Sequence, residues 1–291
     1  MRRLFVPACV FALLPALLSA AEPVPTPAEI DRLWALRAEG SKGGHALPGP
    51  IDLTIDACRA ALAAEPGSLE PRWRLMRALY FKGEHTTDDS VAKRTLFDEG
   101  RTVAEQALGI LRREAGREAH RDLGKATPVE LVPYVKGIPA SLPSFLWASV
   151  DWGKWALVFG KSAAVKQGAA AKIRDYAQAV ILLDPAYDGG GGYRVLGRLH
   201  HQTPAVPFLT GWASRTEALK NLRLAVEAGP RNLVGRQFLA EAMWDYEASR
   251  RAEARTMLEK ILVETPDPDY LVENRRTQEE AAQLVKEWAG R

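Results

Sequence analysis

Arginine, histidine and aromatic side chains recur at one-turn spacing in several segments that read as helices. Arg194, Arg198 and His201 lie four and three residues apart, which places them on one face of a helix. Arginine presents a planar fork that suits carboxylates, so this face suits a small organic anion or an acidic segment of a partner protein. A solvated face is the alternative, although three cationic groups on one stripe repel one another unless something offsets them.

Other helical segments carry similar residues when each is read at the fifth, ninth and twelfth positions of a helix-pair unit. Aromatic and arginine side chains supply much of the binding energy at recognition surfaces. We therefore expect a concave binding groove that also includes Trp73, Arg77, Tyr80, Trp152, Trp155, Gln237, Glu241 and Trp244. Packing in the core is the alternative for the tryptophans, because large rings dominate cores as well as interfaces.

Metal, nucleotide and hydrolytic chemistry have little support in the sequence. His200 and His201 are adjacent, whereas a helical zinc site needs histidines one turn apart. The glycine run 189–192 follows no strand and precedes no lysine at P-loop spacing, so it indicates a turn rather than a phosphate cradle. No Gly-x-Ser-x-Gly or His-Glu-x-x-His signature occurs. We expect no metal, no cofactor and no enzymatic activity; a hydrolase using His200 or His201 is the least favoured alternative.

The elements that position these residues are helices. Residues 26–29 (Thr-Pro-Ala-Glu) and 214–217 (Ser-Arg-Thr-Glu) are capping boxes, each followed by apolar residues at helical spacing. No stretch shows sustained alternation of apolar and polar residues between turn signals, so no strand is required. The expected fold class is all-α.

Helical segments that end in proline recur along the chain. Similar apolar segments end at Pro66, Pro185, Pro230 and Pro266, and the last two prolines lie 36 residues apart. This spacing is close to the roughly 34 residues of a tetratricopeptide repeat, in which small residues let two antiparallel helices approach closely. We expect tetratricopeptide-like helical hairpins stacked as a solenoid or compact superhelix.

The N-terminus carries a pattern typical of export. Arg2 and Arg3 precede an apolar stretch from Leu4 to Leu18, and small residues then predict signal-peptide cleavage before Glu22. The apolar stretch is short for a bilayer span and contains two prolines, which disfavours an uncleaved anchor. We expect the mature protein to be soluble and periplasmic or secreted.

Length and composition agree with a globular domain. The 291 residues are 47% hydrophobic and 26% charged, and the formal net charge is only +3. A nucleic-acid-binding domain usually shows a larger, clustered basic excess, so we expect no nucleic-acid partner. We divide the chain into a signal peptide (1–21), a linker with an N-terminal helix (22–49) and a helical domain (50–291).

Cys58 is the only cysteine that follows the expected signal peptide. A single cysteine forms no intramolecular disulfide, so stability must come from the core. Cys58 shares an apolar helical stripe with Ile55 and Leu62. This placement favours a buried, inert thiol over a reactive one.

The middle of the chain resembles a known family. The pattern comprises the run 146–155 (Leu-Trp-Ala-Ser-Val-Asp-Trp-Gly-Lys-Trp), the run 183–190 (Leu-Asp-Pro-Ala-Tyr-Asp-Gly-Gly), Arg194, Leu196-Gly197, and a loop with Pro204 and Pro207. It resembles the periplasmic T component associated with tripartite ATP-independent periplasmic (TRAP) transporters, a tetratricopeptide-like family. The likeness covers residues 139–288 and, more weakly, 50–116.

The resemblance implies a non-enzymatic helical partner of a solute-binding protein that can form pored homo-oligomers. We therefore expect an exported helical-repeat protein that binds a periplasmic protein, the solute-binding protein of a TRAP transporter being the partner that the family implies. Family members are often lipid-anchored, whereas this chain has no cysteine at the expected mature start. A general envelope scaffold without a solute pathway is the alternative.

Overall fold

The computed structural model describes residues 23–204 and 210–290. Within these ranges the chain forms helices joined by short turns, and no β-strand is present. The all-α prediction is confirmed. The expected signal peptide and Pro207 of the family-like pattern lie outside the described residues.

The helices divide into two regions, which we call the body and the stack. The body contains α1 (Pro27–Ala35), η1 (Leu36–Ala38), α2 (Pro48–Ala64), α3 (Glu70–His85), α4 (Ser90–Ala119), α5 (Pro128–Val135), α6 (Ser141–Phe159), α7 (Lys161–Lys166) and α8 (Ala169–Leu183). The stack contains α9 (Tyr187–Gln202), α10 (Arg215–Ala228), α11 (Leu233–Tyr246), η2 (Ala248–Arg250), α12 (Arg251–Leu262), η3 (Pro268–Tyr270) and α13 (Leu271–Trp288).

Several helices start at side chains that accept hydrogen bonds from free backbone N–H groups. Thr26 and Ser214 each accept the N–H of the residue three positions further on, so both predicted capping positions begin a helix. Thr127 and Glu130 form a complete reciprocal capping box before α5. Proline in the first turn of α1, α2, α3 and α5 removes an N–H that would have no partner there.

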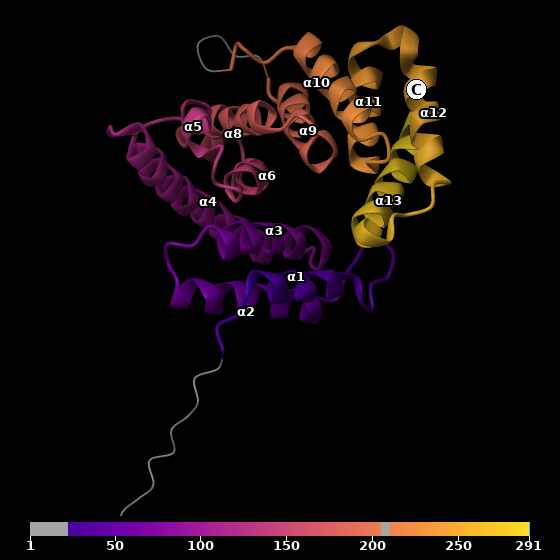
Figure 1. Ribbon diagram of the computed structural model, residues 1–291. Coiled ribbons are helices and arrows are strands. Elements are labelled where there is room, and N and C mark those ends of the chain that lie inside the picture. The colour runs from indigo at the N-terminus through magenta and orange to yellow at the C-terminus, as the bar shows by residue number, and fades with distance from the viewer. Residues whose placement is uncertain (1–22, 205–209, 291) are drawn as a thin grey trace, which may run out of the picture.

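Helices that are neighbours in sequence pack side by side, so the chain winds round in a series of helical pairs (Figure 1). The closest pairing joins α9 to α10. A Cβ atom on Gly197 of α9 would lie 2.6 Å from Leu222 Cγ of α10, so only glycine fits this approach. Ala218, Leu222 and Ala225 of α10 are buried there, as the repeat pattern predicted.

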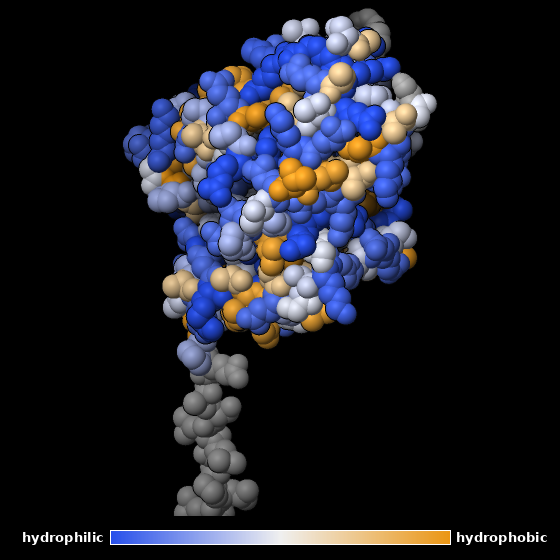
Figure 2. Space-filling model, turned by 90° about the vertical axis from the view of Figure 1, so that its right-hand side faces the viewer, coloured by the Kyte–Doolittle hydropathy of each residue, from blue (hydrophilic) through white to orange (hydrophobic). Residues whose placement is uncertain are grey.

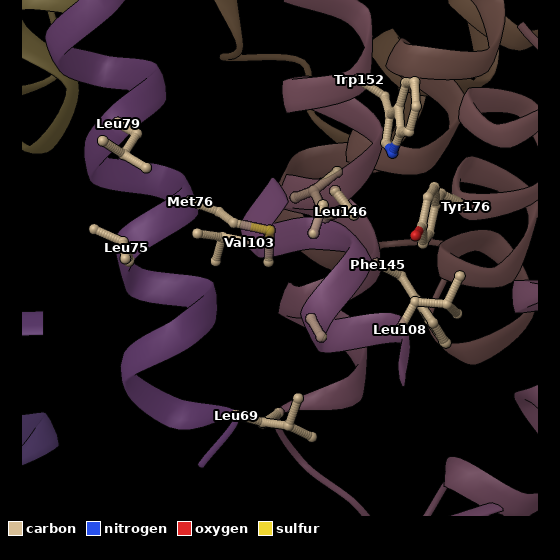
Figure 3. Close-up of a cluster of buried hydrophobic side chains, with 14 of the residues drawn as sticks. Leu69, Leu75, Met76, Leu79, Val103, Leu108, Phe145, Leu146, Trp152 and Tyr176 are labelled. Atoms are coloured by element: carbon tan, nitrogen blue, oxygen red, sulfur yellow. The ribbon is translucent and has the colours of Figure 1, made fainter. Parts of the chain in front are cut away.

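Each of the two regions contains one hydrophobic cluster. The larger cluster fills the body, where α3, α4, α6 and α8 meet (Figure 3). There Met76 of α3 and Val103 of α4 face Leu146 of α6, and Trp152 and Tyr176 lie deeper between α6 and α8. The smaller cluster lies within the stack, mainly between α11, α12 and α13, and consists largely of leucine and alanine with two tryptophans. The stack therefore buries less apolar surface than the body.

The last helix returns to the first part of the chain. Val272 of α13 packs in the cluster of the body. The Arg37 guanidinium pairs with Glu273 at 2.9 Å, and the Gly44 N–H donates to Glu279 Oε1 at 2.9 Å. These contacts close the arrangement, so α3, α6, α9, α11 and α13 surround a common centre (Figure 1).

The outside of the stack is mainly hydrophilic. Figure 2 shows small hydrophobic groups separated by hydrophilic residues on the face that α12 and α13 present. Within residues 23–204 and 210–290, no helix has the length and apolar character needed to cross a bilayer.

Candidate binding surface

The helices around the common centre contribute a set of polar and aromatic side chains that we call the inner surface. It consists of Tyr80 and Glu84 of α3, Trp147 and Lys154 of α6, Arg194 and Arg198 of α9, Gln237 and Glu241 of α11, and Glu273 and Glu280 of α13. Contacts and electrostatic coupling link these residues across helices that are far apart in sequence. The inner surface is the candidate functional site.

Tyr80 of α3 is linked to residues of α6 and α13. Its ring contacts the Trp147 ring at 5.6 Å between centroids, and the Lys154 ammonium lies 5.6 Å from its centroid. Burial raises the pKa of Tyr80 well above its usual value, and the carboxylates of Glu84, Glu273 and Glu280 raise it further. The hydroxyl of this one α3 residue therefore feels charges from α13 as well as from its own helix.

Lys154 and Glu84 tie α6 to α3 beside that ring. The Lys154 ammonium lies 2.6 Å from the Glu84 carboxylate. Burial alone would raise the pKa of Glu84, but Lys154 outweighs burial and the pKa is lowered. Glu84 is therefore held as a carboxylate on the inner surface.

The predicted cationic stripe of α9 meets carboxylates of α11. Arg198 Nη1 donates to Glu241 Oε2 at 2.8 Å, and the guanidinium also covers the ring of Phe238 at 4.2 Å. His201 Nε2 lies 2.9 Å from an oxygen of Asp245. The internal carboxylates offset the repulsion that the spacing of the stripe implied.

Arg194 occupies a different position because it stabilises a tight turn at the start of α9. Its guanidinium pairs with Asp188 Oδ2 at 2.5 Å and also donates to the Asp188 carbonyl oxygen at 3.1 Å. Asp188 has a φ of 51°, a left-handed conformation that costs a non-glycine residue energy. The predicted turn therefore exists, with Arg194 compensating for its strain.

Arg77 and Trp73 belong to a stack of alternating guanidinium groups and indole rings between α1 and α3. Arg37 and Arg77 lie over the ring of Trp34, at 4.2 and 4.0 Å from its centroid. Arg77 and Arg74 in turn lie near the ring of Trp73, at 4.9 and 4.1 Å. Burial lowers the pKa of Arg77 to about 10, although its pairing with Asp31 opposes this effect. The stack joins the N-terminal helix to α3 and borders the inner surface.

The other predicted groove tryptophans lie in the hydrophobic clusters. Trp152 and Trp155 of α6 are buried between α4 and α8; Lys172 lies over the Trp152 ring, and the Trp155 indole donates to Asp98 at 2.9 Å. Trp244 of α11 stacks on Trp288 of α13 with 4.1 Å between ring centroids. For these three rings the packing alternative is the one that the structure supports.

Sequence reasoning missed Trp147 and the carboxylates of α13. Trp147 and Lys154 are seven residues apart and share the face of α6 that meets Tyr80. Reading the repeat offsets from Trp152 selected the opposite, buried face. Glu273 and Glu280 lie seven residues apart, a spacing that places both on one face of a helix. The repeat pattern covers only helical segments that end in proline, and α13 is not one of them.

The adjacent residues His200 and His201 make separate interactions. His200 Nδ1 accepts the Ser214 N–H at 3.2 Å, whereas His201 faces Asp245. Over the described parts of the chain, no group of three or more histidine, cysteine, aspartate or glutamate residues is arranged to hold a metal ion.

Cys58 is fully buried in the body cluster. Burial raises the pKa of its thiol to about 12, which keeps the thiol protonated at neutral pH. The prediction that the Cys58 thiol is buried is confirmed.

Comparisons with known proteins do not assign a family. No protein-family model matches the chain, and no curated protein matches it in sequence.

Proposed function

We propose that this chain is a non-enzymatic, exported helical-repeat protein that binds a partner protein on its inner surface. The position of Tyr80 carries this proposal. Its partly accessible ring lies beside Trp147 and among charged groups of α3, α6, α9 and α13. Aromatic rings surrounded by paired charges are typical of recognition surfaces, where rings supply binding energy and charges supply specificity.

The helical pairs support a tetratricopeptide-like arrangement in this proposal. Helices α9 and α10 form one close pair and α11 and α12 the next, and Pro230 and Pro266 follow the second helix of each. In such an arrangement the first helix of each pair lines the binding side. Helices α9 and α11 both contribute to the inner surface, in agreement with that role.

The transport context of the proposal comes from the resemblance of residues 139–288 to the T component associated with TRAP transporters. On that basis we assign the protein as an accessory component of TRAP-type solute uptake in the periplasm. Its partner would be the solute-binding protein of the transporter. The basic, apolar and small-residue order of residues 1–21 supports export.

An affinity capture experiment tests the proposal. The tagged mature protein is used to capture periplasmic proteins of the organism that encodes it, and the captured proteins are identified by mass spectrometry. Tyr80→Ala removes the ring beside Trp147, whereas Tyr134→Ala removes a partly exposed tyrosine of α5 outside the inner surface. We expect a solute-binding protein to be captured by the parent and by Tyr134→Ala, and at least about tenfold less by Tyr80→Ala.

Two outcomes would redirect the proposal. Capture of envelope proteins without a solute-binding protein would favour the general scaffold over the transport component. Equal capture by Tyr80→Ala and the parent would contradict the inner surface as the binding site. Circular-dichroism melting of both variants establishes that a lost interaction is not a lost fold.

A further inference from the structure

The imidazole of His201 on α9 lies between a hydrogen-bond donor and a hydrogen-bond acceptor, and its side chain is only 7% exposed. Its Nδ1 lies 3.2 Å from Nη1 of Arg198 on the same helix, and its Nε2 lies 2.9 Å from Oδ2 of Asp245 on α11. A guanidinium only donates and a carboxylate only accepts, so Nδ1 accepts and Nε2 donates. These contacts therefore fix one neutral tautomer, with the proton on Nε2.

The other nitrogens of Arg198 are also engaged. Nη1 donates to Glu241 Oε2 of α11 at 2.8 Å in addition to its contact with the imidazole. Nη2 and Nε donate to the amide oxygen of Gln202, at 2.9 and 3.0 Å, when that amide is oriented so that its atoms are satisfied. The neutral imidazole and Glu241 therefore share Nη1, which links α9 to α11.

The remaining neighbours of the imidazole come from α10 and α11. Tyr246 of α11 packs its ring edge-on at 5.2 Å between centroids and donates its hydroxyl to the His201 carbonyl oxygen at 3.0 Å. The Arg215 guanidinium of α10 lies 5.3 Å from the centre of the Tyr246 ring. His200 contacts Ser214 instead. Within the described parts of the chain, Nδ1 of His201 contacts no acceptor to which it can donate if it gains a proton.

Protonation reverses the hydrogen-bonding role of Nδ1. An imidazolium donates from both nitrogens, so its Nδ1–H would face the N–H donors of Arg198 and place two cations in contact. Asp245 stabilises the imidazolium through Nε2, so the ring has a partner for its new charge. The carboxylate next to Nη1 is that of Glu241, so the imidazolium and the guanidinium then compete for it.

We propose that His201 is a pH-dependent switch that controls the link between Arg198 of α9 and Glu241 of α11. The neutral ring holds the arginine on the carboxylate, and the protonated ring repels it. Histidine ordinarily changes charge between pH 5 and 8, whereas guanidinium groups and carboxylates ordinarily keep theirs. Below this range the inner surface, to which Arg198 and Glu241 belong, carries one more positive charge. The switch needs no partner and does not rest on the proposed function.

Nitrogen-15 NMR of the histidine side chains tests the tautomer on which the switch depends. His201→Gln identifies the signals of His201 by their disappearance. At pH 8 we expect a proton on Nε2 and none on Nδ1, and at pH 5 we expect both nitrogens to carry one. A proton on Nδ1 at pH 8, or a ring that is still neutral at pH 5, would overturn the proposal.

A double-mutant cycle tests the switch itself. Urea denaturation of the parent, Arg198→Ala, Glu241→Ala and the combined variant gives the coupling between the two side chains at pH 8 and at pH 5. We expect the coupling to change the unfolding equilibrium constant about fivefold at pH 8 and about twofold or less at pH 5. Equal coupling at the two pH values would contradict the switch. Circular dichroism at each pH establishes that all four proteins are folded.

Two matched backgrounds assign the effect to His201. His201→Gln keeps an amide donor for Asp245 but takes up no charge, so the coupling in this background should be the same at pH 5 and pH 8. His45→Gln replaces an exposed histidine outside the stack and should preserve the pH dependence of the parent. A fall in coupling that persists in His201→Gln would assign it to another group and overturn the proposal. None of these measurements involves partner capture, so the switch and the proposed function fail separately.

Discussion

The helices of the body and the helices of the stack pack in different ways. In the body, α6 packs against α3, α4 and α8, and large rings such as Trp152 fill the space between them. In the stack, successive helical pairs form a thinner layer, and polar contacts such as Arg198–Glu241 and Gln237–Glu280 join neighbouring inner helices. The register of a repeat therefore places Arg198 and Glu241 of the stack and Tyr80 of the body on the inner surface. It fails for Trp152 and Trp155 of the body and for Trp244 of the stack, because burial of large rings decides which way those residues face.

The largest expected effect concerns the core of the body. Trp152→Ala empties the space between α6 and α8 and should lower the free energy of unfolding by about 3–5 kcal/mol. Trp147→Ala, on the same helix but on the inner surface, should cost less than half as much. Urea denaturation of the parent and both variants measures the difference. Equal losses would mean that the two faces of α6 are equally buried.

In the stack, stability depends on the close approach of α9 and α10 rather than on buried rings. Ala225 is buried against the glycine turn of α9, so Ala225→Trp should overfill the α9–α10 contact and cost about 1–3 kcal/mol. Glu227→Trp, on the exposed side of α10, should change stability by less than about 0.5 kcal/mol. Thermal melting compares the two. An unchanged melt for Ala225→Trp would contradict the tight pairing.

A buried acid in the body provides a pH test. Asp151 is fully buried, neither of its oxygens has a partner among the described residues, and burial raises its pKa well above the usual value. The folded state therefore holds this proton over a pH range in which the unfolded state has lost it. It follows that the contribution of Asp151 to stability is complete below about pH 4 and declines as the pH rises.

Asp151→Asn removes this titration without changing the shape of the side chain. We expect the variant to match the parent near pH 4 and to exceed it by about 1–2 kcal/mol at pH 7. Urea denaturation across that range measures the difference. A variant that is less stable than the parent at pH 7 would show that the carboxylate has a stabilising partner, and that the body tolerates ionised groups as the stack does.

The smallest effects belong to ion pairs of the stack. Arg198→Ala breaks a half-buried pair with Glu241 and should cost about 1 kcal/mol. Arg223→Ala breaks the more exposed pair with Glu247 and should cost less than about 0.5 kcal/mol. Thermal melts at low and high salt rank the two. If both variants melt like the parent, the polar contacts between α9 and α11 contribute nothing to the stack.

Local patterns predicted the elements well because their causes are local. The capping residues Thr26 and Ser214 begin helices, and the apolar stripes of α2 and α10 are buried. Backbone N–H groups at a helix start need an acceptor within a few residues, so the sequence contains the whole explanation. The burial of Cys58 follows from the same periodicity.

The pairing of charges was beyond the reach of local patterns. Arg194 and Arg198 share a stripe in sequence, yet one stabilises a strained turn at Asp188 and the other binds Glu241 of the following pair. The pairing of Arg198 depends on a residue of another helix, whereas the pairing of Arg194 depends on the left-handed turn within α9 itself. The same spacing was therefore compatible with a free cationic groove and with the neutralised surface that the structure contains.

The sequence by itself determined the helical class, the helix starts and the apolar stripes, because these depend on interactions between residues a few positions apart. The tertiary structure decided which face of α6 is buried and which polar groups lack partners. It also decided that α13 returns to α3, so that the charges of Glu273 and Glu280 raise the pKa of Tyr80. Those features depend on contacts between distant segments, where burial and charge are set by every helix that meets at the site.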